Sequence, residues 1–500
     1  MKNNTEKKIS FGSYAKNVLF KNKVIILFTV LCIGCIAASN TSLNYIASEV
    51  FSRFGRNACL VLALIIPCLA GLGMNFGIVV GAIAAQIAIF FVVHWGFTGI
   101  GGFMLCALFA TPMAILFVWL LGILFNKTKG SEMITGLVLG FFADGVYRLF
   151  TLYIIGGLIP YDDPNLLDRG FGLRNAFDLS DSIKYALDDI SFVTVFRILM
   201  LFIIAVQLIN IVFGSKKNMT VDKKESMGKI IASAIGLVLS FVLMAVPGVS
   251  SMIGGTRLIL SDTLRIAMIV YLLSLVIRKF ALKRDVTKDK LVKTAVLTAV
   301  VLALSYVPAI RDILKSVSIS ACTYAVICLF CFFNNWILDT KLGQDMRTVG
   351  QNRIVAGSAG INVDKIRITA TCISTVLAAW GQLIYLQNLG TFNTVQQQSN
   401  VGLYAVAALL VGGASVQKAN NRQAIIGVVL FHTLFVVAPL AATQIIGDSA
   451  ISEYIRMFIC YGVIAVSLAM HAWKKKDKKV VKKTAGDEEN TDAVKSVIWP

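Results

Sequence analysis

The chain has 500 residues, of which 57% are hydrophobic and only 15% are charged, and its mean hydropathy is +0.77. A soluble core of this size cannot bury so much apolar surface, so the composition indicates a polytopic membrane protein. The formal net charge of +20 does not indicate nucleic-acid binding, because the basic residues lie in short clusters beside apolar runs; a bias of positive charge toward the cytoplasm explains them better.

Apolar windows long enough to cross a bilayer as helices recur between Val24 and Met470. The alternating stretches of roughly ten residues that membrane barrels use do not occur. We therefore expect an all-α fold, a polytopic transmembrane helical bundle of about 12 to 14 spans, some of them broken or re-entrant. The predicted spans are residues 24–39, 58–69, 74–94, 101–125, 133–159, 192–213, 230–246, 264–276, 294–307, 319–338, 368–386, 403–416, 424–442 and 454–470.

The segments that flank the spans predict the topology. Segment 1–23 and the beginning of segment 474–500 are basic, so we place both termini in the cytoplasm, with a single membrane domain, 24–473, between them. The end of the tail is acidic and has too few apolar residues to fold, so we expect it to be disordered. No region is left for a soluble domain.

Polar residues and glycines inside the spans mark a candidate substrate pathway. Asn75 and Gln86 are 11 residues apart, about three helical turns, and would share one face of the predicted span 74–94. That face either lines the pathway or forms hydrogen bonds between helices. The stretches GLGMNFG and VGGAS indicate either broken helices at a midplane site or close helix packing. The candidate pathway residues are Asn75, Phe76, Gln86, Tyr404, Gly412 and Gly413.

Asp144 and Arg148 are four residues apart with the acid first, which is the favourable order for an ion pair on a helix. Both lie near the middle of the predicted span 133–159. We interpret them as a structural ion pair, and contact with a substrate is the alternative.

Segment 160–191 is the largest predicted external loop, and its charge is opposite to that of the other connections. Seven aspartates outnumber its basic residues, and aromatic residues are interspersed among them. The loop either docks an extracellular partner or is simply solvated.

Residues that would support enzyme chemistry are missing from the sequence. It has no GxxxxGK[ST] run to hold nucleotide phosphates, and the histidines at 94, 432 and 471 lack metal-ligand spacing. Its cysteines lie in or beside apolar segments and are interpreted as small buried hydrophobic residues. We expect neither a metal nor a cofactor in this chain, and no enzymatic activity.

The segment from Thr340 to Ile361 is a mildly basic stretch punctuated by glycines between two long apolar runs. A loop and short helix of this kind are suited to contact with a cytoplasmic partner.

Four stretches resemble the permease subunits of ABC importers for simple sugars and nucleosides. They are GLGMNFGIVVGAIAAQ at 71–86, GSEMITGLVLGFF at 130–142, LGQDMRTVGQNRIVAGSAGINVDKIR at 342–367 and NVGLYAVAALLVGGAS at 400–415, in the order of the family. The chain departs from the family at Gly140, where an asparagine is usual, and at Arg353 and Val355, which replace a proline and an alanine. Residues around 229–310 add helices to the usual family plan.

The resemblance implies that the cytoplasmic loop 340–366 carries a coupling helix that docks on an ATPase. The residues that we assign to this coupling are Met346, Arg347, Gly350, Asn352, Ala356, Ala359, Gly360 and Ile361.

The resemblance also implies a function and partners. The chain would be a permease subunit in a bacterial plasma membrane that translocates a simple sugar or nucleoside. Its partners would be cytoplasmic ABC ATPase subunits that hold ATP and Mg, an extracytoplasmic solute-binding protein, and a second permease subunit, identical or paralogous. The alternative is a secondary transporter driven by an ion gradient, for which Asp144 is the one fair candidate among acidic residues.

Overall fold

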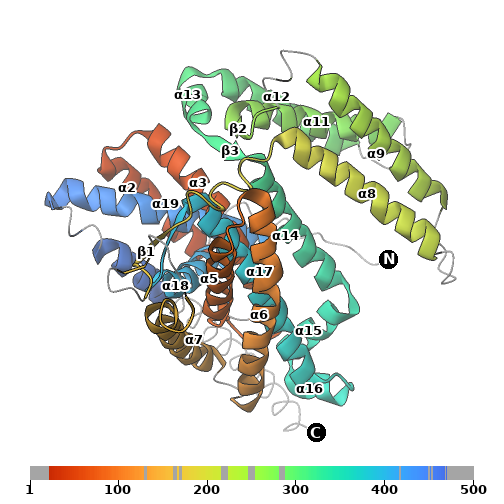
Figure 1. Cartoon of the computed structure of the whole chain (residues 1–500). Helices are drawn as coiled ribbons and strands as arrows, with labels where there is room; N and C mark the ends of the chain where they lie inside the picture. Colours follow the sequence, from red (N-terminus) through yellow and green to blue (C-terminus); the bar gives the residue numbers. More distant parts are fainter. Residues whose placement is uncertain are drawn as a thin grey trace, which may run out of the picture.

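The computed structural model describes residues 22–128, 132–160, 166–167, 172–214, 223–245, 250, 254–280, 288–415, 418–448, 451, 454–467 and 469. Most of these residues are helical (Figure 1). The predicted cytoplasmic segment 1–23, except for its last two residues, and the predicted tail 474–500 lie outside the described residues, as do parts of the predicted loop 160–191.

Helix α17 (Val363–Leu389) is the centre of the larger bundle. It begins where Asn362 accepts a hydrogen bond from the Lys365 amide, and it ends at Gly390, whose φ of 80° stops the helix. Three long helices make its most extensive contacts, and small residues allow their backbones to come close. They are α3 (Leu43–Ala63), α5 (Ile78–His94) and α6 (Gly99–Lys127).

A second layer of helices surrounds this centre. One of them, α19, packs on α2 and α3, while α18 lies between α19 and α5. Helix α7 continues into a short π-helical turn, η1, and packs on α5 and α6. The bounds are α2 (Lys23–Ser39), α7 (Glu132–Leu149), η1 (Phe150–Ile154), α14 (Ala321–Asp339), α18 (Gln397–Val411) and α19 (Asn421–Ile446).

The first long span is broken before it returns. Helix α3 passes almost directly into α4 (Ile65–Leu69), residues 70–77 are not helical, and α5 begins only at Ile78. The predicted span 58–69 is therefore the end of a longer apolar run, Leu43–Leu69. The charged residues in its first half hid that run from the hydropathy pattern.

Among the described residues, seven helices are long and apolar enough to cross a membrane, or up to eight if the bent pair α12 and α13 counts as one span. Four further apolar helices are shorter, namely Lys23–Ser39, Ile78–His94, Ser233–Val242 and Tyr454–Ser467. The fold is thus a polytopic helical membrane bundle, as predicted. Full-length spans are fewer than the predicted 12 to 14, because several predicted spans are short or broken helices.

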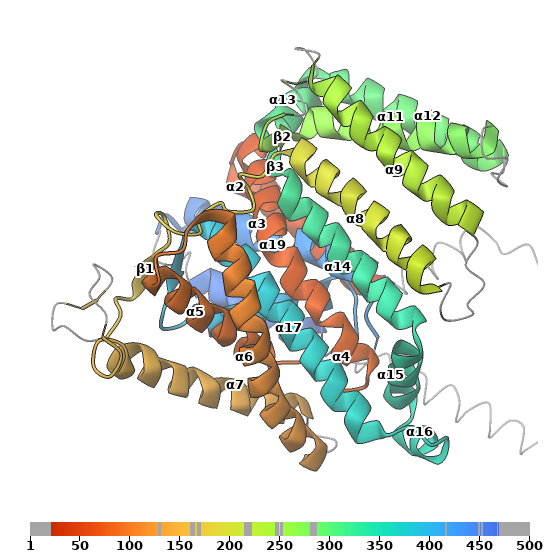
Figure 2. The ribbon, with the colours of Figure 1, turned by 45° about the vertical axis from the view of Figure 1, so that its right-hand side comes forward.

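A second group of helices stands beside the main bundle (Figure 2). Within it α8 pairs with α9 and α11 pairs with α12, and it meets the main bundle where α8 contacts α14 and α13 contacts α3. Helices α12 and α13 are bent by 88° relative to each other. The bounds are α8 (Phe192–Gly214), α9 (Lys223–Met244), α11 (Leu260–Phe280), α12 (Lys288–Tyr306) and α13 (Pro308–Ser316). We call this group the side bundle.

Two short antiparallel ribbons fasten connections to the helices. Strand β1 (Ala176–Asp178) pairs with β4 (Thr391–Asn393), with Phe177 opposite Phe392 and their rings stacked at 4.9 Å. Strand β2 (Arg257–Ile259) pairs with β3 (Ser318–Ser320) just before α14 and so ties the side bundle to the main bundle. In both views β2 and β3 lie at the opposite end of the molecule from α15 and α16 (Figures 1 and 2).

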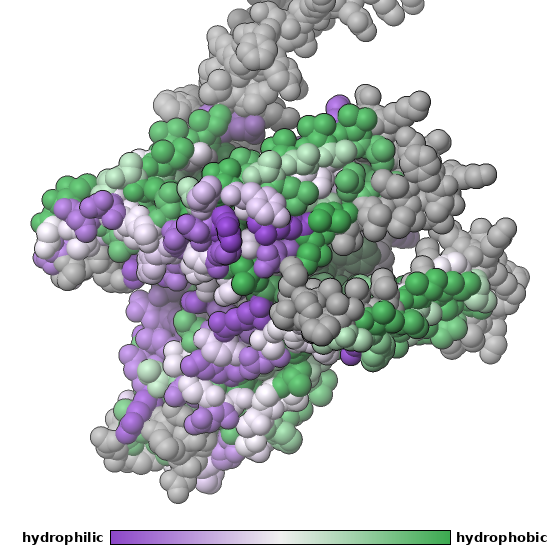
Figure 3. Space-filling model, turned by 90° about the horizontal axis from the view of Figure 1, so that it is seen from above, coloured by the Kyte–Doolittle hydropathy of each residue, from purple (hydrophilic) through white to green (hydrophobic). Residues whose placement is uncertain are grey.

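Large apolar side chains are exposed along the flanks of both bundles. Leu108, Phe142, Phe202 and Val238 are each more than half exposed. Such surfaces are suited to lipid and not to water. Viewed from the end that carries β2 and β3, hydrophilic residues gather across the middle and hydrophobic residues lie toward the sides (Figure 3).

Candidate functional site

The segment predicted to couple the chain to a partner forms two short helices, α15 (Lys341–Gln351) and α16 (Arg353–Ser358). Thr340 caps the first by accepting a hydrogen bond from the Gly343 amide. Asn352 separates the two: its backbone is extended, and its side-chain oxygen accepts from the amides of Ile354 at 3.0 Å and Val355 at 3.3 Å. An asparagine at this position ends one helix and starts the next.

One face of this helix pair is anchored against the rest of the chain. Met346, Val349 and Ala356 are buried. Gly350 lies so close to the end of α4 that a Cβ atom there would be 2.0 Å from the Leu69 carbonyl oxygen. Met346 and Ala356, which the sequence predicted as coupling residues, therefore hold the helix pair in place and do not form its outer surface.

The other face is exposed and partly apolar. Ile354 is 82% exposed and Val355 is 58% exposed, although both lie in a polar stretch. Of the predicted residues, Arg347, Asn352, Ala359 and Gly360 are exposed, and Ile361 is half-buried. The sequence prediction did not include Ile354. The available signal was two adjacent aliphatic residues directly after a helix-capping asparagine.

The helix pair also contacts the break between α4 and α5. The guanidinium of Arg353 donates to the Gly71 carbonyl at 3.1 Å, and the Gly350 backbone packs on Gly71. Four residues further on, Asn75 donates to Ser374 of α17 at 3.4 Å, and the Ser374 hydroxyl donates to the Ala63 carbonyl at 2.8 Å. A continuous set of contacts therefore joins the outer surface of α16 to the centre of the bundle.

The predicted shared face of Asn75 and Gln86 is wrong. Asn75 precedes α5 and lies in the non-helical turn, where its side chain accepts a hydrogen bond from the Gly77 amide at 3.0 Å. The glycines around it allow this turn, with Gly71 and Gly73 at positive φ. The GLGMNFG stretch thus breaks the helix, which was one of its two predicted roles.

Gln86 on α5 and Gln382 on α17 are completely buried, and neither side-chain amide has a hydrogen-bond partner among the described residues. The two helices pack on each other. A buried amide without a partner is costly, so both positions are candidates for a polar partner that the described residues do not supply. Gln382 was not among the predicted pathway residues.

The remaining predicted pathway residues serve packing. A Cβ atom on Gly412 would be 1.9 Å from the Gln423 carbonyl oxygen, so Gly412 lets α18 approach α19, and Gly413 follows with a φ of 80°. Tyr404 stacks edge-on with Phe435 at 5.0 Å. Phe76 is half-buried and packs against the core.

The predicted ion pair between Asp144 and Arg148 is present. Arg148 donates to one Asp144 oxygen at 2.8 and 3.0 Å, and Gln398 of α18 donates to the other oxygen. Both carboxylate oxygens are therefore occupied, and Asp144 links α7 to α18.

Comparison with known proteins gives the family. Residues 219–468, half of the chain, match the model of a family described as the permease component of branched-chain amino acid transport systems. The chain belongs to this permease family. The match includes α15, α16 and much of the side bundle, whereas the sequence resemblance was weakest in that bundle. Membership in a family of transport permease components agrees with the expectation that the chain is not an enzyme.

Two curated relatives of this permease are similar over part of their length. It is 30% identical over 150 residues to the xylose transport system permease protein XylH of Haemophilus influenzae, covering 30% of this chain and 36% of XylH. It is 29% identical over 118 residues to the autoinducer 2 import system permease protein LsrC of Klebsiella pneumoniae, covering 22% of this chain and 34% of LsrC. The chain thus spans about a third of the length of the curated relatives it matches. No solved structure matches it significantly. The relatives and the family confirm the predicted resemblance to import permeases.

Proposed function

We propose that this chain is the membrane-spanning permease subunit of an ABC importer for a small polar solute, driven by ATP that a partner subunit binds with Mg and hydrolyses. The observation that supports this most is the helix pair α15–α16, which exposes Ile354 and Val355 while its other face is anchored to α4. An exposed apolar pair on a rigid, capped element is suited to docking on another protein. A simple sugar is the first choice of solute because XylH is named for xylose; a nucleoside is the wider choice.

Such a permease has a defined orientation and several partners. Helices α15 and α16 face the cytoplasm and dock on an ABC ATPase subunit, and both termini lie on that same side of a bacterial plasma membrane. An extracytoplasmic solute-binding protein delivers the solute at the opposite end, and a second permease subunit, identical or paralogous, completes the pathway. The seven long helices, the bent pair and the four shorter apolar helices make twelve membrane elements, the lower limit of the predicted range.

The contacts of α16 suggest how the ATPase drives transport. A displacement of α16 would move Gly71 through Arg353 and Gly350, and with it the turn that holds Asn75 against Ser374. Tightly packed helices move as rigid bodies between discrete arrangements, so a small displacement there would re-orient α5 relative to α17. The amides of Gln86 and Gln382 lie on these two helices and would supply hydrogen bonds to solute hydroxyl groups.

The ion-gradient alternative depends on Asp144, and the geometry does not favour it. A carboxylate that carries a proton or cation through a transport cycle must be available to that ion. Both oxygens of Asp144 already accept hydrogen bonds from Arg148 and Gln398.

The test is an Ile354→Asp variant, with Gln344→Asp as the control because Gln344 is also exposed on this helix pair. The charge at Ile354 should prevent the ATPase from co-purifying with the chain and abolish ATP-dependent solute uptake in vesicles, with an unchanged elution volume on gel filtration. The control should retain both. Normal ATPase recovery and uptake with Ile354→Asp would overturn the proposal.

A further inference from the structure

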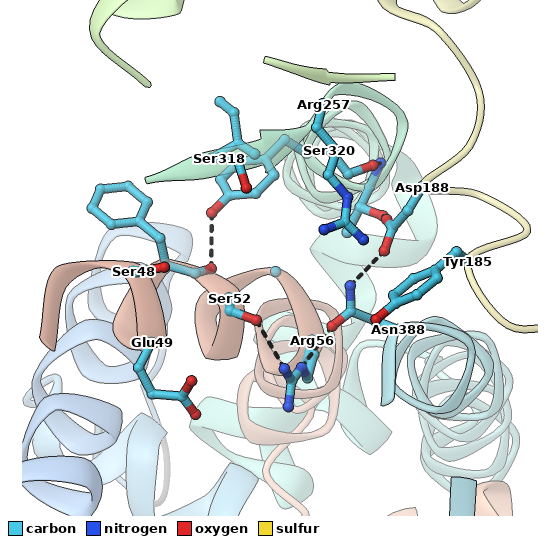
Figure 4. Close-up of a pocket in the computed structure, with 15 residues that line it drawn as sticks. Ser48, Glu49, Ser52, Arg56, Tyr185, Asp188, Arg257, Ser318, Ser320 and Asn388 are labelled. Carbon is cyan, nitrogen blue, oxygen red and sulfur yellow. Dashed lines mark hydrogen bonds between the residues drawn. The ribbon is translucent and has the colours of Figure 1, made fainter. Parts of the chain in front are cut away.

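A polar cavity of about 200 Å³ is lined in part by residues of β2 and β3. These strands lie at the end of the molecule opposite α15 and α16 (Figure 2). Its walls come from both bundles: α3 and the end of α17 belong to the main bundle, β2 leads into the side bundle, and residues 185–188 precede α8. Figure 4 shows Arg257 entering from one side and Arg56 from the other, with Asp188 and Asn388 between them.

The acidic side chains of the cavity already have partners. Asp188 is buried, and it accepts hydrogen bonds from the Thr323 hydroxyl at 2.6 Å and from the Asn388 amide. Glu49 forms an ion pair with Arg53 at 2.7 Å. The charge of Glu49 is thus offset by Arg53, whereas Asp188 has only neutral partners; neither carboxylate forms an ion pair with Arg56 or Arg257 among the described residues.

The two arginines of the cavity have only neutral partners. Arg56 donates to the Asn388 side-chain oxygen at 2.6 Å and to the Ser52 hydroxyl at 2.9 Å. Arg257 is exposed and lies over the Tyr185 ring at 4.8 Å. Within the part of the chain that the structure describes, no carboxylate forms an ion pair with either guanidinium. Two arginines and two carboxylates thus line one small cavity. Arg53, outside the lining, offsets the charge of Glu49, so the charged groups in and beside the cavity leave about one positive charge in excess.

We propose that this cavity binds a singly charged phosphate group, held between Arg56 and Arg257. Guanidinium groups present several N–H donors in a plane that matches the oxygens of a phosphate, and such charge-assisted hydrogen bonds are among the stronger ones in proteins. The serine hydroxyls on the walls supply further donors. A bound phosphate would join the side bundle to the main bundle through β2 and α3. Neither Gln86 nor Gln382, which the proposed function places in the solute pathway, lines this cavity.

The phosphate has two possible sources, which share this chemistry. One is inorganic phosphate from solution. The other is the headgroup of an anionic phospholipid, because the cavity lies at the junction of two bundles with apolar flanks.

The experiment uses the full chain purified in mild detergent, with two probes. Thermal unfolding is followed against inorganic phosphate, with sodium chloride at equal ionic strength as the control. Retention of phosphatidylglycerol is measured by native mass spectrometry, with phosphatidylcholine as the control lipid. The variants are Arg56→Gln and Arg257→Gln, and Arg311→Gln is the matched control because Arg311 is an exposed arginine on α13 outside the cavity.

Saturable stabilisation by phosphate, weakened about tenfold or more in both cavity variants and not in the control, supports a site for free phosphate. Selective retention of phosphatidylglycerol that the same two variants lose supports a lipid headgroup site. Equal behaviour of wild type and Arg257→Gln toward both probes overturns the proposal. Arg257 is exposed and on the surface of the fold, so this variant should remain folded even if Arg56→Gln does not.

Discussion

The main bundle and the side bundle are both built from apolar helices, but they differ in how closely those helices pack. In the main bundle, α17 is surrounded by α3, α5 and α6, and glycines bring backbones together, so 61% of the most apolar window of α17 is buried. In the side bundle, α8 has only 6% of its most apolar window buried, and its helices touch mainly in pairs. In the proposed mechanism the tightly packed main bundle transmits motion, whereas the side bundle adds surface and lines one wall of the polar cavity.

The largest loss of stability and transport should come from a substitution where α15 packs against α4 of the main bundle. In a Gly350→Ala variant, the added Cβ would clash with the Leu69 carbonyl, since backbone on both sides leaves no room to adjust. We expect a loss of about 1–3 kcal/mol in stability and most of the transport activity. Gly357→Ala is the control, because Gly357 is exposed on α16 with nothing within 4 Å.

Thermal unfolding in detergent and solute uptake in vesicles measure both variants. Gly357→Ala should be neutral or slightly more stable, since alanine favours helix over glycine. An equally stable and active Gly350→Ala would mean that α15 is not firmly anchored to α4, and the proposed transmission to Gly71 would fail with it.

A smaller loss of stability is expected from Asp144→Asn, which tests whether Asp144 joins α7 to α18 in a purely structural role. The variant removes the charge that Arg148 and Gln398 contact. Because the Arg148 side chain is 40% exposed and therefore screened by solvent, we expect a loss of only about 1 kcal/mol. ATP-dependent uptake should persist.

The outcome for Asp144→Asn is decided by measuring uptake and unfolding on the same preparation. Abolished uptake in a protein of unchanged stability would contradict the structural role and favour the ion-gradient transporter. Arg148→Gln serves as the partner control, because a structural pair should give a similar, small loss from either side.

The sequence predicted the helical membrane fold, because long apolar runs are a local signal, and it offered a break near Gly71 as one of two roles for the clustered glycines. It missed the first half of α3, since Glu49, Arg53 and Arg56 lower the hydropathy there. The structure shows why a helix tolerates them: Glu49 pairs with Arg53 one turn away, and Arg56 reaches Asn388. These partners offset the cost of placing charged residues in the helix. Arg53 lies one turn from Glu49, but Asn388 is far from Arg56 in the chain and only the fold brings the two together, so hydropathy could not reveal it.

The candidate sites were predicted less completely, for a related reason. The segment of α15 and α16 was found because it is polar between apolar runs, but which of its residues face inward depends on contact with Leu69. The cavity was not found, because Arg56, Asp188, Arg257 and Asn388 come from four distant segments that only the fold brings together. The Asn75 prediction failed because it assumed that helix α5 extended through the glycines.

The smallest expected effect belongs to the side bundle and would show whether it moves independently of the main bundle. Arg197 on α8 lies 3.8 Å from the centroid of the Phe241 ring on α9 and donates to Ser240 at 3.1 Å. Arg197→Met should weaken the α8–α9 pair by about 0.5–1 kcal/mol, since Phe241 is largely exposed. Hydrogen exchange should accelerate in α8 and α9 and remain unchanged in α3 and α17, with Arg311→Met as the neutral control. Accelerated exchange in α17 as well would show that the two bundles open as one cooperative unit.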